Sequence, residues 1–428
     1  MNMLKPSLLS VAVALAASSP LLLQADNSVK PEAVVSHYAD IALAGYQDSL
    51  STAETLLSAV QKLVAEPTEA NLQLAREAWI AARVPYQQTE VYRFGNAIVD
   101  EWEGKVNAWP LDEGLIDYVA QASYGDSSDE NPLYSANVIA NPTLSINGKN
   151  IDASTIDKKL LAEVLHEAEE VEANVATGYH AIEFLLWGQD LNGTSPGAGQ
   201  RPATDYDTAN CTGGNCDRRG QYLVAATELL IDDLKEMVAN WQAEGAARQE
   251  LLNKPAAEGL ATMLTGMGSL AYGELAGERT KLGLMLHDPE EEHDCFSDNT
   301  HWSHYYDAKG IQNVYLGQYQ RVNGDVVQGP SLADLVKMKD AQLDTAMRQR
   351  LQATESAAQA MVDQAKQGNT FDVLIGAGNQ EGNQIVQNFV DSLTQEARTL
   401  EQLVAKLDAA AISIEGSDSL DNLSAVSQ

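Results

Sequence analysis

The sequence has few cysteines, few aromatic residues and few basic residues. Three cysteines in 428 residues are too few for a disulfide-rich scaffold or a zinc ribbon bound by thiolates alone. Aromatic residues make up 6% of the chain, while alanine, leucine, glutamate and glutamine are abundant, so the composition favours helices over strands. With 27 lysines and arginines against 61 aspartates and glutamates, the formal charge is −34. This charge disfavours nucleic acids and anionic membranes as partners.

The N-terminal segment is predicted to be an export signal. Residues 1–25 contain one lysine, Lys5, followed by an apolar run over residues 8–23, and cleavage is expected after Ala25. A membrane anchor is disfavoured because the run is short and contains Pro20. No later apolar run reaches membrane-spanning length, so we expect a mature chain without a transmembrane span, in an exported compartment.

An exported compartment is oxidising, which permits disulfide bonds. Cys211 and Cys216 are close enough in sequence to close a short loop, and Cys295 is left over. The sequence leaves the pairing of the three cysteines open.

Helical periodicity covers most of the remaining sequence. The segments with apolar residues at helical spacing are 31–63, 69–94 (with a kink expected at Pro85), 155–187, 218–241, 257–286, 331–367 and 380–410. Residues 188–214 are rich in Gly, Asn, Pro, Thr and Asp and are predicted to be a loop between two halves. We therefore predict an all-α fold of two helical-bundle domains, residues 31–195 and 215–425, which arose by internal duplication.

The segment Gly178–Trp187 contains the most informative motif. His180 and Glu183 are three residues apart and share one face of the predicted helix, so an imidazole and a carboxylate could bind one cation. The spacing alone is not specific, because His166 and His287 also precede a glutamate by three residues. Glu183, however, lies in an apolar run, where an unpaired carboxylate is costly to bury.

Three kinds of neighbour could neutralise Glu183: a proton, a basic partner such as Arg93, or a metal ion. A purely structural His180–Glu183 pair stays open as the alternative to a ligand pair.

Further charged residues lie on the apolar face of the predicted helix 69–94. Glu90 and Arg93 share that face with Trp79, so we expect them to point inward or into a cleft. The alternative is an exposed ion pair at a helix end, which would contribute little. Glu113, next to Asp112, adds a hard oxygen ligand nearby in sequence.

The segment 287–304 combines four histidines, six acidic residues and one cysteine. Imidazole and carboxylate ligands suit iron, zinc or copper, although acidic loops are often simply solvated. Signatures of hydrolases are weak: Phe184 stands where an inverted zinc-protease motif needs a second histidine.

These motifs resemble the imelysin family, which includes iron-regulated protein A-like proteins and carries the M75 peptidase label. The resemblance rests on Gly178-x-His180-x-x-Glu183, on residues 82–95, on Trp109-Pro110-Leu111-Asp112-Glu113 and on Gly277-Glu278-Arg279. It implies an all-helical fold of two bundle-like domains with a site near their junction. It also implies export to the periplasm or outer membrane and a link to iron uptake.

By this resemblance His180 and Glu183 are the motif residues, and Glu90, Glu113 and the supporting Arg93 are expected in the same site. The first hypothesis is a periplasmic or cell-surface protein that binds iron, or zinc or another divalent metal, for uptake together with partners in the cell envelope. The second is a metal-dependent peptidase, and the third is a non-catalytic binding protein for a peptide, haem or glycan. Binding is favoured over catalysis because the motif lacks a second neighbouring histidine.

Overall fold

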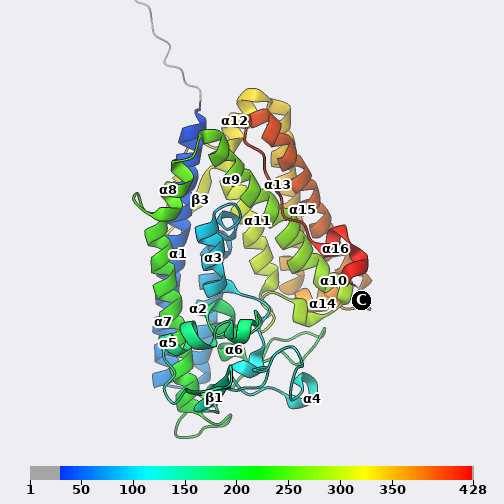
Figure 1. The fold of residues 1–428 in the computed structure, drawn as a ribbon. Helices are drawn as coiled ribbons and strands as arrows, with labels where there is room; N and C mark the ends of the chain where they lie inside the picture. The colour runs from blue at the N-terminus through cyan, green and yellow to red at the C-terminus, as the bar shows by residue number, and fades with distance from the viewer. Residues whose placement is uncertain (1–28, 427–428) are drawn as a thin grey trace, which may run out of the picture.

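Helices form most of the structure, a computed structural model that describes residues 29–426. The predicted signal segment, residues 1–25, lies outside the described residues. The long helices run side by side, with α1 and α7 at one edge and α13 and α15 at the other (Figure 1). The all-α prediction is confirmed.

A first group of helices packs around α1 and α7. Its members are α1 (Pro31–Ala65), α2 (Glu69–Gln87), α3 (Ala97–Asn107), α6 (Gly178–Trp187) and α7 (Cys216–Trp241). Pro31 at the start of α1 fits the first turn of a helix, where a backbone N–H would lack a partner anyway. The Thr68 side chain caps α2 by accepting a hydrogen bond from the Asn71 amide at 3.2 Å.

A second group packs around α13 and α15. Its members are α9 (Ala256–Ser269), η6 (Leu270–Lys281), α10 (Leu282–Leu286), α11 (Thr300–Leu316), α12 (Leu332–Lys339), α13 (Ala341–Ala365), α14 (Phe371–Ile375) and α15 (Gln380–Leu407). The helices α9, η6 and α10 form one continuous run in which η6 is π-helical. This run corresponds to the helix predicted over residues 257–286.

Short elements connect the long helices. They are η1 (Glu90–Tyr92), η2 (Glu113–Leu115), α4 (Gln121–Tyr124), α5 (Lys158–Leu160), η3 (Leu161–Leu165), η4 (Ala168–Glu170), η5 (Ala203–Asp205), α8 (Ala246–Leu252), η7 (Pro289–Glu291), α16 (Asp418–Asp421) and α17 (Leu423–Val426). Two small antiparallel hairpins were not predicted: β1 (Thr143–Ile146) with β2 (Lys149–Asp152), and β3 (Gln318–Gln320) with β4 (Val326–Gln328).

The two groups of helices contact each other directly. Helix α1 packs against α9, and α2 packs against α11. Helix α7, which follows the predicted loop 188–214, packs against α1 and α6 of the first group. A division into two duplicated domains at that loop stays a prediction.

The helix predicted over residues 155–187 is interrupted. The chain leaves the helical conformation at His166, and Glu167, Glu169 and Glu170 have positive φ angles before α6 begins at Gly178. Tertiary hydrogen bonds explain the break, because the intervening segment bonds to other parts of the chain. Its Thr177 hydroxyl donates to the Lys105 carbonyl at 2.9 Å.

Two other predicted helices also differ from the structure. The helix predicted over residues 331–367 is split at Asp340, whose extended backbone and side chain cap the start of α13 by accepting from the Leu343 amide at 3.0 Å. The helix predicted over residues 69–94 ends at Gln87, and the Thr89 hydroxyl donates to the Tyr86 carbonyl there at 2.6 Å.

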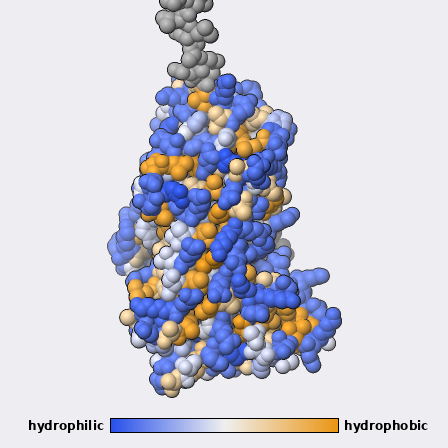
Figure 2. All heavy atoms as spheres, turned by 90° about the vertical axis from the view of Figure 1, so that its left-hand side faces the viewer, coloured by the Kyte–Doolittle hydropathy of each residue, from blue (hydrophilic) through white to orange (hydrophobic). Residues whose placement is uncertain are grey.

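The face of the molecule formed by α1, α7 and α8 is mostly hydrophilic, with hydrophobic atoms in narrow patches (Figure 2). Among residues 29–426, no helix combines the length and the apolar character needed to cross a bilayer.

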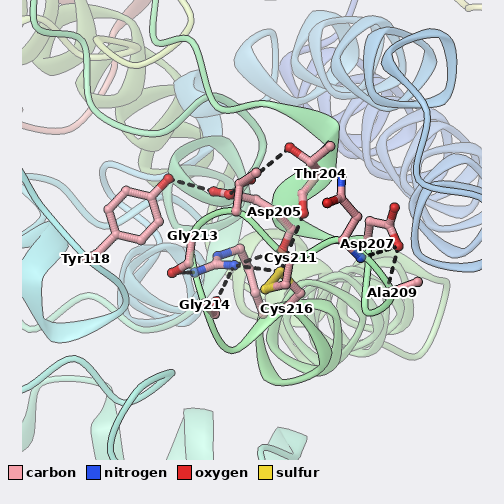
Figure 3. The surroundings of a disulfide bond; sticks show 12 residues. Tyr118, Thr204, Asp205, Asp207, Ala209, Cys211, Gly213, Gly214 and Cys216 are labelled. Carbon is pink, nitrogen blue, oxygen red and sulfur yellow. Dashed lines mark hydrogen bonds between the residues drawn. A yellow bond between two sulfur atoms is a disulfide. The ribbon is translucent and has the colours of Figure 1, made fainter.

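A disulfide bond joins Cys211 and Cys216 immediately before α7, with their Cα atoms 5.9 Å apart (Figure 3). Arg219, one turn into α7, donates to the carbonyl oxygens of Gly214 at 2.9 Å and Asp205 at 2.8 Å. The loop is thus held to the helix that follows it. Cys295, the third cysteine, is buried and unpaired.

Candidate metal centre

Helix α6 carries the motif of the sequence analysis, and all 10 of its residues are buried. It begins at Gly178, whose φ of +78° lies in the left-handed region that favours glycine. A Cβ atom at Gly178 would lie 2.4 Å from the carbonyl oxygen of Val106. Glycine therefore lets the start of α6 lie directly against the end of α3, and this contact positions His180 and Glu183.

His180 and Glu183 face each other inside the protein. Nδ1 of His180 lies 3.1 Å from Oε2 of Glu183, and neither side chain is exposed. The other carboxylate oxygen, Oε1, accepts hydrogen bonds from the amide of Ser297 at 2.9 Å and from its hydroxyl at 2.6 Å. Within residues 29–426, Nε2 of His180 has no hydrogen-bond partner. Among the described residues, one nitrogen of this buried imidazole is therefore bonded to Glu183 and the other has no partner.

The loop before α11 supplies further donor atoms. The His293 ring lies 4.7 Å from the His180 ring, between centroids. Oδ1 of Asp294 lies 3.6 Å from Nδ1 of His293 and 4.0 Å from Nδ1 of His180. One donor atom from each of these three residues lies within 4.8 Å of the others. This spacing suits a single ion whose bonds to nitrogen and oxygen are about 2.0–2.2 Å long.

Asp294 is held by several hydrogen bonds. Arg83 contacts its Oδ1 at 2.7 Å, while the Asn299 side chain, at 2.9 Å, and the Ser303 hydroxyl donate to its Oδ2. The amide of Asp294 donates to the Thr300 hydroxyl at 2.8 Å. These bonds fix the loop before the start of α11 and hold the carboxylate in one orientation.

Arg83 is itself fixed by polar and aromatic contacts. Its Nη1 donates to Oδ1 of Asn107 at 2.6 Å. Its guanidinium lies over the rings of Trp79, Tyr86 and Tyr179, between 5.1 and 5.6 Å from their centroids. The positive charge of Arg83 therefore cannot move away from Asp294 without losing these contacts.

Burial and nearby charges set the protonation of the site. Burial lowers the pKa of His180 to about 3 and lowers the pKa of His293 well below its ordinary value, so both imidazoles are neutral. Burial alone would raise the pKa of Asp294, but Arg83 beside it holds that pKa below its ordinary value. Burial, together with the charge of Asp294, raises the pKa of Glu183 well above its ordinary value. One arginine thus faces two carboxylates, and Glu183 needs a proton or a cation.

Arg93, the predicted partner of Glu183, lies in a different cluster. Its Nη1 is 3.7 Å from Glu103 and 3.6 Å from Glu274. The positive charge that acts on Glu183 is that of Arg83. The structure therefore does not pair Arg93 with Glu183.

Glu90 belongs to the same cluster as Arg93. Its Oε2 lies 2.7 Å from Arg279, which also contacts Glu274 at 2.7 Å and Asp307 at 3.3 Å. The carboxylate of Glu90 is thus offset by a guanidinium, and its expected role as a metal ligand stays a prediction.

Glu113 lies on the wall of a separate cavity of about 550 Å³, where Asp112, Asp190 and Glu290 also lie. Burial, together with the charge of Glu290, raises the pKa of Glu113 to about 7. Its Oε1 accepts a long hydrogen bond, 3.4 Å, from Gln189. Glu113 is not among the donor atoms grouped around the α6 motif, and its role as a ligand also stays a prediction.

A second cavity, of about 470 Å³, reaches His293 and is lined by Asn107 and Trp109. The charged residues of its wall are Glu103, Glu167, Glu172, Glu274, Glu278 and Glu291, with Arg93 and Arg279. Six glutamates against two arginines make its potential negative, which concentrates cations next to the buried donor atoms.

The sequence indicates residues 287–304 as one candidate region and does not distinguish among its four histidines. The structure brings His293 to the site, whereas Nδ1 of His287 donates to the Ile375 carbonyl at 2.6 Å and His304 lies beside Thr280. Nothing in the local sequence separates these histidines, because only the tertiary fold brings residue 293 to residue 180. Arg83 lies in the stretch 82–95 that resembles the family, but α2 also carries Arg76 and Glu77, so the sequence does not single out Arg83 as the buried cation.

Comparisons with known proteins agree with the resemblance in the sequence. The sequence model of the Imelysin family, also labelled peptidase M75, matches residues 42–400. A protein named iron-regulated protein A from Synechococcus elongatus is 37% identical over 82 residues, which cover 19% of this chain. The match spans only 23% of that relative's length.

The fold is also similar to a crystal structure. That structure, of a protein described as an iron-regulated protein A precursor from Parabacteroides distasonis, gives a TM-score of 0.64. The match covers 88% of this chain and 95% of the other, at 19% sequence identity. The likeness therefore concerns the fold.

Proposed function

Because the chain belongs to the imelysin family, we propose that it is an exported iron-handling protein that binds one metal ion. The ligands would be His180, His293 and Asp294, whose donor atoms lie together, and Glu183, which lies 3.1 Å from His180. The observation that carries the proposal is the meeting of two imidazoles and two carboxylates in a fully buried place, with a single arginine as counter-charge. The iron-regulated relatives support iron as the ion.

The donor set is consistent with iron. Two histidines with one or two carboxylates form a ligand set that non-haem iron(II) uses, and zinc accepts the same donors. The neutral imidazoles of His180 and His293 need no deprotonation near neutral pH. The Glu183 carboxylate would then balance the charge of the ion, as Arg83 balances Asp294.

Binding of an ion is favoured over peptide hydrolysis because a polypeptide cannot reach the buried side chains of the site. His180, Glu183 and Asp294 are 0% exposed, and a polypeptide substrate needs a cleft that reaches the metal-bound water. The acidic cavity that ends at His293 instead suits a small hydrated cation. We therefore propose capture of the ion, for delivery to uptake partners in the cell envelope.

Titration calorimetry on chelator-treated protein tests the site, with iron(II) under anaerobic conditions and with zinc. We expect one high-affinity site in the wild type and an affinity reduced by roughly 10–100-fold or more in His180→Gln, because a ligand is lost. His166→Gln is the matched control, since His166 also precedes a glutamate by three residues but bonds to Thr177 and the Ala176 amide. Equal affinity of His180→Gln and wild type would contradict the proposal.

A further inference from the structure

A second group of carboxylates includes Asp298, which lies on the same loop as His293 and Asp294. Oxygen atoms of Asp190, Asp298 and Asp372 lie within 4.8 Å of one another. Asp190 follows α6, Asp298 lies just before α11, and Asp372 lies in α14. The group therefore joins three segments that are far apart in sequence.

Several carboxylate oxygens at this place have no hydrogen-bond partner among residues 29–426. Asp372 is 0% exposed, and neither of its carboxylate oxygens has a hydrogen-bond partner among the described residues. The same holds for Oδ1 of Asp298 and for Oε1 of Glu292, which is 1% exposed. The Thr370 hydroxyl and the Val373 amide lie beside Asp372 without reaching hydrogen-bond geometry. Buried oxygens without donors are rare in folded proteins and call for a ligand.

No lysine or arginine within residues 29–426 forms an ion pair with Asp190, Glu292, Asp298 or Asp372. The contacts around them are with neutral groups: Asn192 donates to Asp190 at 2.6 Å, and Thr370 donates to Asp298 at 3.5 Å. Burial and the charges of Asp372 and Asp190 accordingly raise the pKa of Asp298 to about 8. A cation between the carboxylates would remove this repulsion.

We propose that Asp190, Asp298 and Asp372, with Glu292 beside them, form a second cation site that takes calcium. The donors are all hard oxygens, the ligands that Ca²⁺ prefers, whereas the site at His180 offers nitrogen as well. Calcium–oxygen bonds of about 2.3–2.6 Å place oxygens on opposite sides of the ion about 4.6–5.2 Å apart, which the separation of these atoms allows. Water reaches the site at Asp190, which is only half-buried, and completes the coordination.

The bound ion would hold together the segment after α6, the loop before α11 and α14. Glu292 and Asp298 flank His293 and Asp294 on that loop. Calcium thus stabilises the loop that also carries the iron ligands proposed above, while the two ions occupy different donor sets.

Calcium titration of the chelator-treated full chain, by calorimetry and by thermal unfolding, tests this site. We expect binding with a Kd of about 10⁻³ M or tighter, and a melting temperature that rises when about 5 mM calcium is added. The double variant Asp298→Asn/Asp372→Asn should lose both the calcium binding and the rise in melting temperature. Asp126→Asn/Asp129→Asn, a change of two exposed aspartates, keeps both.

The experiments distinguish a failure of the calcium proposal from a failure of the iron proposal. His180→Gln keeps the calcium response, because His180 is not one of the oxygen donors. A wild-type protein without any calcium response, or a response retained in Asp298→Asn/Asp372→Asn, would overturn the calcium site. If the double variant does not fold, wild-type crystals soaked in terbium chloride decide: an anomalous peak among the three aspartates supports the site, and its absence overturns it.

Discussion

Two buried glutamates show how surroundings decide the role of a residue. Glu183 lies among other polar groups, next to His180 and Ser297. Glu396 on α15 is equally buried, but among the described residues only the hydroxyl of Thr354 donates to it, and its Oε1 has no partner. The effect of Glu396 on the free energy of unfolding therefore measures what it costs to bury a carboxylate that lies outside a polar site.

Glu396 is expected to make folding depend on pH. Burial raises its pKa to about 7 in the folded protein, above its ordinary value, so the folded state holds the proton more tightly. Its stabilising contribution is therefore fully present below about pH 4.5 and is lost as the pH rises through about 7. Glu396→Gln should remove this dependence and raise the unfolding free energy at pH 8 by about 1–3 kcal/mol.

Denaturant unfolding between pH 5 and pH 8 measures this effect. Glu401→Gln, a change of an exposed glutamate on the same helix, is the control and should shift stability by less than about 0.5 kcal/mol. A Glu396→Gln protein that is no more stable than wild type at pH 8 would show that burial does not destabilise the ionised carboxylate of Glu396.

At the scale of elements, the site depends on how closely α6 approaches α3. The N-terminus of α6 has room for a hydrogen atom but not for a methyl group at Gly178, because the Val106 carbonyl lies there. The same contact explains why a glycine begins the motif Gly178-x-His180-x-x-Glu183.

Gly178→Ala is predicted to destabilise the protein by about 2–4 kcal/mol and to weaken metal binding, because α6 must shift and the positive φ is strained. Gly125→Ala is the control: its φ is +94°, but nothing lies within 4 Å of the added Cβ, so its cost should be about 1 kcal/mol. Thermal and denaturant unfolding compare the two. Equal costs would refute the steric explanation.

Periodicity predicted the long helices well and predicted α11 not at all. The amphipathic segments α1, α7 and α15 each bury a regular apolar stripe, and the sequence shows it. Helix α11 instead buries His301, His304 and Asp307, so its inward face does not look apolar.

Only the part of the candidate site that lies on one helix could be predicted from the sequence. His180 and Glu183 are identifiable because a carboxylate in an apolar helix needs a partner. His293, Asp294 and Arg83 come from other elements, and only tertiary packing brings them to α6.

At the scale of the whole molecule, the acidic charge is the dominant feature. At a formal charge of −34 the like charges of the protein repel one another, and the face shown in Figure 2 is mostly hydrophilic. The same charge favours cations over anionic partners.

Salt should therefore stabilise the protein. Raising sodium chloride from about 0.02 M to about 0.5 M shortens the screening length several-fold and should raise the melting temperature by at least about 2 °C at pH 7.5. At pH 4.5, where part of the carboxylates are protonated, the rise should be smaller. A melting temperature that is constant or falls with salt at pH 7.5 would contradict this prediction.

The most direct test of the account is diffraction from crystals soaked in iron(II), with data collected on both sides of the iron absorption edge. We predict one strong anomalous peak bounded by His180, Glu183, His293 and Asp294, and a peak at the same place at the zinc edge after a zinc soak. Well-diffracting soaked crystals with no peak there, and with Glu183 bonded only to His180 and Ser297, would contradict it.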